Sequence, residues 1–257
     1  MTTHAIGDTA VLTRRSLTHI ARGPDTIITT AIMPIAFLLL FVFVLGGAVD
    51  IGAGAGAGGY VDYLLPGILV ITIASGISYT AYRLFLDLQG GILERFRSMP
   101  IARSAVLWAH VLTSLVANLV AVALVIGVAL LMGFRSSATV LDWLAVAGIL
   151  VLLTLALTWL AIIPGLTAKS IDGATAFSYP LILLPFVSSA FVPTESMPGP
   201  VRWFAEHQPV TAIVDAVRAL LDHEPVGAAL WVALAWCVGI LLVAYGAAML
   251  AYRRQGR

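Results

Sequence analysis

The chain has 257 residues, of which 60% are hydrophobic and only 11% are charged, and its formal net charge is +1. Soluble domains usually carry about 25% charged residues because a folded globule needs a polar surface, so this composition excludes an ordinary soluble protein. The apolar runs, such as residues 38–45, show no alternation of apolar and polar positions. We therefore expect an all-α integral membrane protein.

Six stretches of the chain are apolar for roughly twenty residues or more, which is the length that a helix needs to cross a bilayer core of about 30 Å. They cover residues 26–49, 60–82, 105–134, 140–168, 174–192 and 227–252. With the N-terminus inside, eleven of the fourteen basic residues fall on the inner side, and only Arg135, Arg202 and Arg218 fall outside. The positive-inside rule then predicts a multi-pass protein of the cell membrane with both termini in the cytoplasm.

The segment before the first predicted span, residues 1–25, is basic and mildly amphipathic. Leu12, Leu17 and Ile20 alternate with basic residues such as Arg14 and Arg15. Such a segment can lie as a helix in the cytoplasmic headgroup layer. A plain orientation signal explains the same pattern equally well.

The second span differs from the others in its mild polarity. It holds Thr72, Ser75, Ser78 and Tyr79. Serine and threonine within a span commonly form hydrogen bonds to neighbouring helices, and lining of a substrate path is the alternative interpretation.

The inner segment between the second and third spans, residues 83–103, is the longest predicted cytoplasmic connection. Its charges alternate in sign, with apolar side chains between them. A short amphipathic helix with an aromatic anchor is suited to a groove on a partner protein, although a solvated loop is the simpler alternative. The candidate docking residues are Asp87, Gln89, Glu94, Arg95, Phe96 and Arg97.

The outer segment before the last span, residues 193–226, is too polar to cross a membrane. Pro209 is suited to the first position of a helix, and an apolar face follows it at helical spacing from Val210 to Leu221. Asp215 and Arg218 lie on the opposite face at a spacing that allows an ion pair. We expect one or two amphipathic helices that dip into the outer leaflet.

A search for catalytic chemistry finds no complete motif. The only lysine, Lys169, precedes Ser170, but the glycines of a phosphate-binding loop are replaced by Ile163 and Ala168. The five histidines are scattered, and no serine has a histidine placed to activate it. We expect no catalytic residue and no metal site, so energy for any transport must come from a partner.

Residues 91–103 (G-I-L-E-R-F-R-S-M-P-I-A-R) resemble the E-R-x-R-x-x-P cytoplasmic loop of ABC-2 type transporter permeases, most closely those of the daunorubicin-resistance type. Residues 191–198 (F-V-P-T-E-S-M-P), 208–211 (Q-P-V-T) and 216–220 (A-V-R-A-L) resemble the same family. So does the Arg14-Arg15 pair, with Arg22 and Pro24, before the first span.

The resemblance implies a half-transporter formed by a single domain, residues 1–257. Two permease subunits, as a homodimer, would bind two ABC ATPase chains, which hold ATP and Mg²⁺, while this chain binds no cofactor. Residues 10–22 would form a connecting helix and residues 84–97 the coupling helix. The outer gate would lie in residues 193–223 and include Pro193, Glu195, Pro209, Asp215 and Arg218.

The resemblance also implies a substrate path lined by the first, second and fifth spans. Pro180 and Pro185 would bend the fifth span there. The expected partners are membrane lipid, the ATPase, the second permease and a hydrophobic or amphipathic small molecule such as an antibiotic, with no nucleic acid. A permease for lipid or polysaccharide is the alternative, followed by an intramembrane enzyme and a non-transporting assembly protein.

Overall fold

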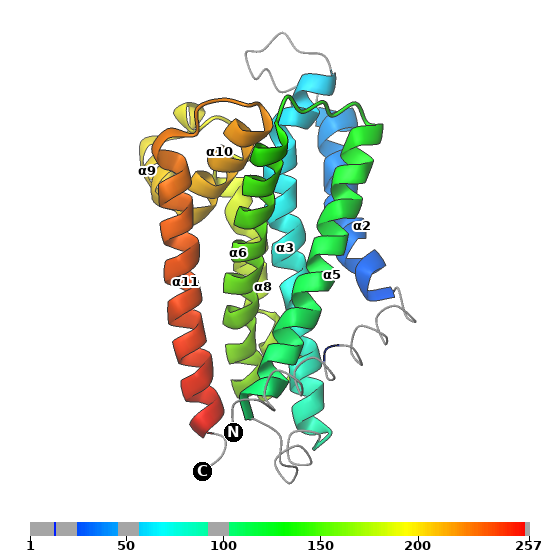
Figure 1. The fold of residues 1–257 in the computed structure, drawn as a ribbon, viewed down its shortest axis with the longest axis vertical. Coiled ribbons are helices and arrows are strands. Elements are labelled where there is room, and N and C mark those ends of the chain that lie inside the picture. The colour runs from blue at the N-terminus through cyan, green and yellow to red at the C-terminus, as the bar shows by residue number, and fades with distance from the viewer. Residues whose placement is uncertain (1–12, 14–24, 46–56, 92–102, 255–257) are drawn as a thin grey trace.

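The computed structural model describes residue 13 and residues 25–45, 57–91 and 103–254, and in these residues every regular element is a helix (Figure 1). The prediction of an all-helical chain is confirmed for this part. In chain order the elements are α2 (Asp25–Leu40), η1 (Phe41–Leu45), α3 (Ala57–Gln89), α5 (Arg103–Leu131), α6 (Val140–Thr167), α7 (Ile171–Thr175), α8 (Ser178–Leu183), η2 (Leu184–Val187), η3 (Thr194–Ser196), α9 (Gly199–His207), α10 (Pro209–Leu221) and α11 (Gly227–Arg254).

Four of these helices, α3, α5, α6 and α11, are long and apolar enough to cross a membrane. They run along the long axis of the molecule, with α9 and α10 packed at one end (Figure 1). We call this the α10 end. The opposite end, where α3 stops at Gln89 and α11 stops at Arg254, is the Gln89 end. The chain is a multi-pass membrane protein.

The first and fifth predicted spans differ from the expectation of single long helices. The first forms an apolar helix over residues 30–44 within α2 and η1, and residues 46–49 of the predicted span lie outside the described residues. The fifth, expected over residues 174–192, is divided between α7, α8 and η2. Pro180 and Pro185 lie in these short pieces, and proline removes a backbone donor that a continuous helix requires.

The second predicted span is longer than expected. The sequence predicts its end at Tyr82, but α3 continues to Gln89, where Gly90 and Gly91 form a turn. Gly91 has a φ of +68°, a conformation that terminates helices and that glycine adopts without strain. Residues 83–89 of the predicted inner segment are therefore the last turns of α3, and residues 92–102 lie outside the described part of the chain.

The core of the bundle is built around α3, which packs against α2, α5 and α6, while α6 also packs against α11. Leu64, Ile68 and Ile71 of α3 are fully buried. By contrast, α11 exposes large apolar side chains along much of its length, including Trp231 and Val243. This difference is expected when the protein core holds α3 and lipid covers one side of α11.

One close approach in this core has a testable consequence. A Cβ atom on Gly67 of α3 would lie 2.6 Å from the Cβ atom of Ala190, which follows η2. Because neither atom can move without its backbone, Gly67→Ala is expected to lower the free energy of unfolding by about 1–3 kcal/mol through overpacking. Thermal unfolding of the purified protein in detergent measures the effect.

The matched control is Gly127→Ala in α5, where the added Cβ atom would meet nothing within 4 Å. Alanine favours a helix over glycine by about 1 kcal/mol, so this variant is expected to unfold at the same temperature as the wild type or higher. Equal unfolding temperatures for the two variants would contradict the packing described at Gly67.

Candidate functional site

The α10 end holds a polar network centred on Arg218 of α10. Its Nη1 atom lies 3.0 Å from Oδ1 of Asp215, one turn earlier in the same helix. Its Nη2 atom donates to the backbone oxygens of Tyr63 at 3.1 Å and Ser189 at 2.9 Å. The guanidinium carbon also lies 4.0 Å from the centroid of the Tyr63 ring, within the range of a cation–π interaction.

Ser189 connects the other members of this network. Its hydroxyl donates to Oδ1 of Asp215 at 2.6 Å, and its backbone oxygen accepts from the Tyr63 hydroxyl at 2.9 Å. One cluster therefore ties together α3, the segment after η2 and α10. The Nε atom of Arg218 is buried and has no hydrogen-bond partner, so the guanidinium has lost water at this position without replacing all of its hydrogen bonds.

The start of α10 is held against η2 by hydrogen bonds. Gln208, the residue before α10, is buried and donates from Nε2 to the backbone oxygens of Leu184 and Val187. Pro209 is the first residue of α10, as the sequence predicts. These contacts hold α10 against η2 and position Asp215 and Arg218 above α3.

Of the five residues predicted to form an outer gate, two belong to the Arg218 network and three lie outside it. Asp215 and Arg218 lie together in the network with Tyr63 and Ser189. Pro193 lies just before η3, Glu195 is exposed within η3, and Pro209 begins α10. In the described part of the chain, no hydrogen bond or ion pair joins any of these three residues to the Arg218 network.

The residues predicted to line a substrate path lie on two elements that pack together, α3 and the α8–η2 region. Thr72 is fully buried and donates its hydroxyl to the backbone oxygen of Ile68 at 2.7 Å. Ser75, Ser78 and Tyr79 are half-buried on α3. Pro180 is exposed in α8, whereas Pro185 is buried in η2. The polar bond of Thr72 is thus internal to its own helix.

Sequence reasoning missed a polar cluster between α3 and α5. Thr80 of α3 donates to the Ser114 hydroxyl at 2.6 Å, and Asn118 donates from Nδ2 to the Ser114 backbone oxygen at 2.9 Å. Asn118 is only 2% exposed, and its Oδ1 atom has no hydrogen-bond partner. The signal available in the sequence was an asparagine one turn after a serine within an apolar span, a pairing that often joins membrane helices.

Gly76 of α3 leaves the space that Asn118 occupies. A Cβ atom at this position would overlap the Asn118 carboxamide, lying 2.1 Å from Oδ1. Small residues let helices approach closely in membranes. The polar pairing of α3 with α5 therefore depends on glycine at this position.

At the Gln89 end, α3 and α5 are joined by an ionisable pair. Nε2 of His110 lies 3.2 Å from Oδ2 of Asp87. His110 of α5 is therefore bonded to a neighbouring helix. Of the predicted docking residues, Asp87 is half-buried and Gln89 is exposed at the end of α3, while Glu94, Arg95, Phe96 and Arg97 lie outside the described residues.

An acidic residue at the α10 end gives a pH-dependent prediction. Burial raises the pKa of the Asp222 carboxyl above its ordinary value of 3.8, and the charges of Glu224 and Asp62 raise it further, against a lowering by Arg218. The folded state therefore binds this proton more tightly than the unfolded state. Its stabilising contribution is present below pH 3.8 and is lost as pH rises through the folded pKa.

Asp222→Asn is accordingly expected to raise the unfolding temperature at pH 7 and to leave it unchanged near pH 3, where aspartate is protonated. Thermal unfolding at the two pH values measures this. A variant that unfolds earlier than the wild type at pH 7 would show that the charge is stabilising instead.

Comparison with known proteins agrees with this architecture. The family model described as ABC-2 type transporter matches residues 8–221. A daunorubicin resistance ABC transporter permease protein, DrrB1, of Streptomyces coeruleorubidus is 30% identical over 241 residues, which cover 89% of this chain and 82% of that protein. A probable doxorubicin resistance ABC transporter permease protein, DrrC, of Mycobacterium tuberculosis is 26% identical over 249 residues, which cover 97% of this chain and 89% of that protein.

Proposed function

The chain belongs to the ABC-2 type transporter family, and on that premise we propose that it is the membrane-spanning permease subunit of an ATP-driven drug exporter. The observation that carries this proposal is the similarity over nearly the whole length to two permeases named for daunorubicin and doxorubicin resistance. The substrate would be a hydrophobic or amphipathic small molecule. A path between apolar helices with a few hydroxyl groups suits such a molecule.

The energy for transport would come from two copies of a separate ABC ATPase that bind ATP and Mg²⁺. In support, the sequence lacks the glycines of a phosphate-binding loop before its only lysine. The docking surface would be the segment from Asp87 to Arg97. The pair between Asp87 and His110 fixes the end of α3 to α5, so a force applied at the segment would reach both helices.

The transport unit would be a homodimer in which each chain contributes one transmembrane domain, residues 1–257. Both termini and the Gln89 end would face the cytoplasm, and the α10 end would face outward. The basic residues support this orientation, because eleven of fourteen lie on the predicted inner side. Residues 10–22 would form the connecting helix at the inner surface.

The substrate would pass along the face of α3 that carries Thr72, Ser75, Ser78 and Tyr79, opposite the segment with Pro180 and Pro185. The outer gate would be formed by residues 193–223. Within it the Arg218 network supports a role in closure, since its contacts join α10 to α3 at the outer end of that path. Pro193, Glu195 and Pro209 would shape the turns that carry the gate.

Affinity purification of the tagged chain from its native membranes tests the proposal. We expect a second polypeptide with a phosphate-binding loop to co-elute, and the eluted complex to hydrolyse ATP faster when daunorubicin is added. The chain purified alone serves as the control and is expected to hydrolyse none. Recovery of the intact chain without any ATPase, or hydrolysis by the chain alone, would overturn the proposal.

A further inference from the structure

The Gln89 end of the molecule carries an open groove between the last turns of α6 and α11. Its volume is about 660 Å³, and it is lined by Leu166, Thr167, Ala168, Ala247, Leu250, Ala251 and Arg254. A volume of this size falls within the range of about 300–1,000 Å³ that is typical of ligand sites. None of the α3 residues of the proposed substrate path lines the groove.

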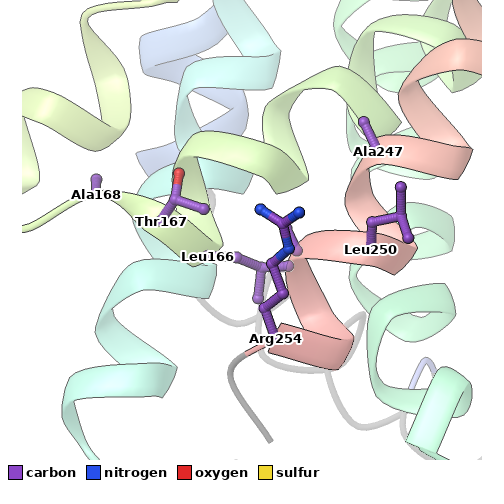
Figure 2. A pocket seen from close by; sticks show the side chains of 7 residues that line it. Leu166, Thr167, Ala168, Ala247, Leu250 and Arg254 are labelled. Carbon is purple, nitrogen blue, oxygen red and sulfur yellow. The ribbon is translucent and has the colours of Figure 1, made fainter. Parts of the chain in front are cut away.

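The groove combines an apolar wall with one cation. Figure 2 shows the guanidinium of Arg254 extending from α11 into the space between the end of α6 and the Ala247–Leu250 turn of α11. Arg254 has no ion pair with any residue that the structure describes. Among the described residues no acidic side chain lines the groove, and the exposed cations Lys169 and Arg253 flank it in the sequence.

The surroundings indicate which kind of molecule reaches this groove. Leu242, Val243 and Leu250 of α11 are 66%, 73% and 59% exposed, as expected of a helix side that faces the hydrocarbon of a bilayer. Arg254 ends the helix, at the depth where an apolar span gives way to headgroups. A lipid that enters from the bilayer could place its acyl chains against the apolar wall and its headgroup at Arg254.

We propose that this groove binds an anionic phospholipid, with its phosphate group on Arg254 and an acyl chain along the seam between α6 and α11. The small side chains of Ala247 and Ala251 leave room for the chain. The planar guanidinium can donate two parallel hydrogen bonds to phosphate oxygens. Basic pockets between membrane helices near the headgroups favour anionic over neutral lipids.

The proposal is tested on the full-length chain purified in detergent, with no ATPase present. The protein is incubated with mixed micelles that contain equal amounts of phosphatidylglycerol and phosphatidylcholine, and bound lipid is counted by native mass spectrometry. The wild type is expected to retain phosphatidylglycerol in preference. Each basic side chain near a membrane surface contributes a factor of about five in affinity, so Arg254→Gln is expected to weaken phosphatidylglycerol binding about fivefold.

Two matched controls distinguish lipid binding in the groove from the effects of surface charge and of an added apolar side chain. Arg253→Gln removes the neighbouring cation and is expected to leave most of the preference intact, because Arg253 does not line the groove. Ala247→Phe fills the groove and is expected to abolish retention, whereas Ala235→Phe, at an exposed position of α11 that does not line the groove, is not. Size-exclusion profiles confirm that each variant remains folded.

Several outcomes would overturn the proposal. Equal retention of the two lipids would show that Arg254 does not select an anionic headgroup. An equal loss in Arg253→Gln and Arg254→Gln would assign the effect to surface charge. Displacement of phosphatidylglycerol by millimolar inorganic phosphate would identify a site for the free anion, in which the acyl chain contributes nothing.

Discussion

Arg218→Ala is expected to lower the free energy of unfolding by about 2–3 kcal/mol and to abolish export. The substitution removes the partner of Asp215, two donors to backbone oxygens and the contact with the Tyr63 ring in a single step. It also separates α10 from α3 at the proposed outer gate. Thermal unfolding in detergent and drug accumulation in cells measure the two effects.

Two controls define the cause of this loss. Arg202→Ala breaks an exposed pair with Glu206 in α9, and such pairs contribute at most about 1 kcal/mol, so little change is expected. Arg218→Lys keeps the charge but loses the planar fork of donors that bonds Asp215 and two backbone oxygens, and an intermediate stability is expected. If Arg218→Ala unfolded at the same temperature as Arg202→Ala, the network would not hold the α10 end together.

The second large effect is expected at the proposed coupling segment. Glu94→Ala combined with Arg97→Ala should sharply reduce co-purification of the ATPase and drug-stimulated ATP hydrolysis, while insertion in the membrane stays intact. The reason is that a docked helix transmits the ATPase cycle only through contacts that last during the movement. Pull-down and export assays on the same membranes measure the loss.

The matched control removes one acidic and one basic residue elsewhere at the same end of the molecule. Lys169→Ala combined with Asp172→Ala leaves the net charge unchanged in the same way, and both residues are exposed. This variant is expected to retain the ATPase. Unchanged export by the Glu94 and Arg97 variant would remove the coupling role from this segment.

The long helices could be predicted from the sequence because the length of an apolar run is enough to indicate them. A run of apolar residues long enough to span a membrane is sufficient evidence for α5, α6 and α11, whose ends lie within a few residues of the predictions. The end of α3 was misjudged, since Arg83 and Asp87 mark the limit of the apolar run and not the limit of the helix. The helix stops where Gly90 and Gly91 lower its propensity.

The fifth span shows what hydropathy cannot resolve. Residues 174–192 are as apolar as a span, and Pro180 and Pro185 suggested only a bend, yet the segment is divided between short helices. Besides the prolines, the chain turns at residues 176–177 between α7 and α8, and both short helices pack against α3. The packing of these helices against α3 cannot be predicted from the local composition of the segment.

The candidate site was predicted only to the extent that it is local. Asp215 and Arg218 are three residues apart on one helix, so their pairing follows from helical spacing. Their contacts with Tyr63 and Ser189 cross between distant parts of the chain, and no single-sequence pattern reports such distances. Asn118 was missed for a related reason, because its importance depends on burial against Gly76.

The central claim is that this chain is a passive conduit driven by a second polypeptide. Inside-out membrane vesicles that contain the chain together with its ATPase test it most directly, through the uptake of daunorubicin with and without ATP. We expect ATP-dependent uptake only when both chains are present, and none with either chain alone. Uptake that proceeds equally well with this chain alone, or with the ATPase alone, would contradict the claim.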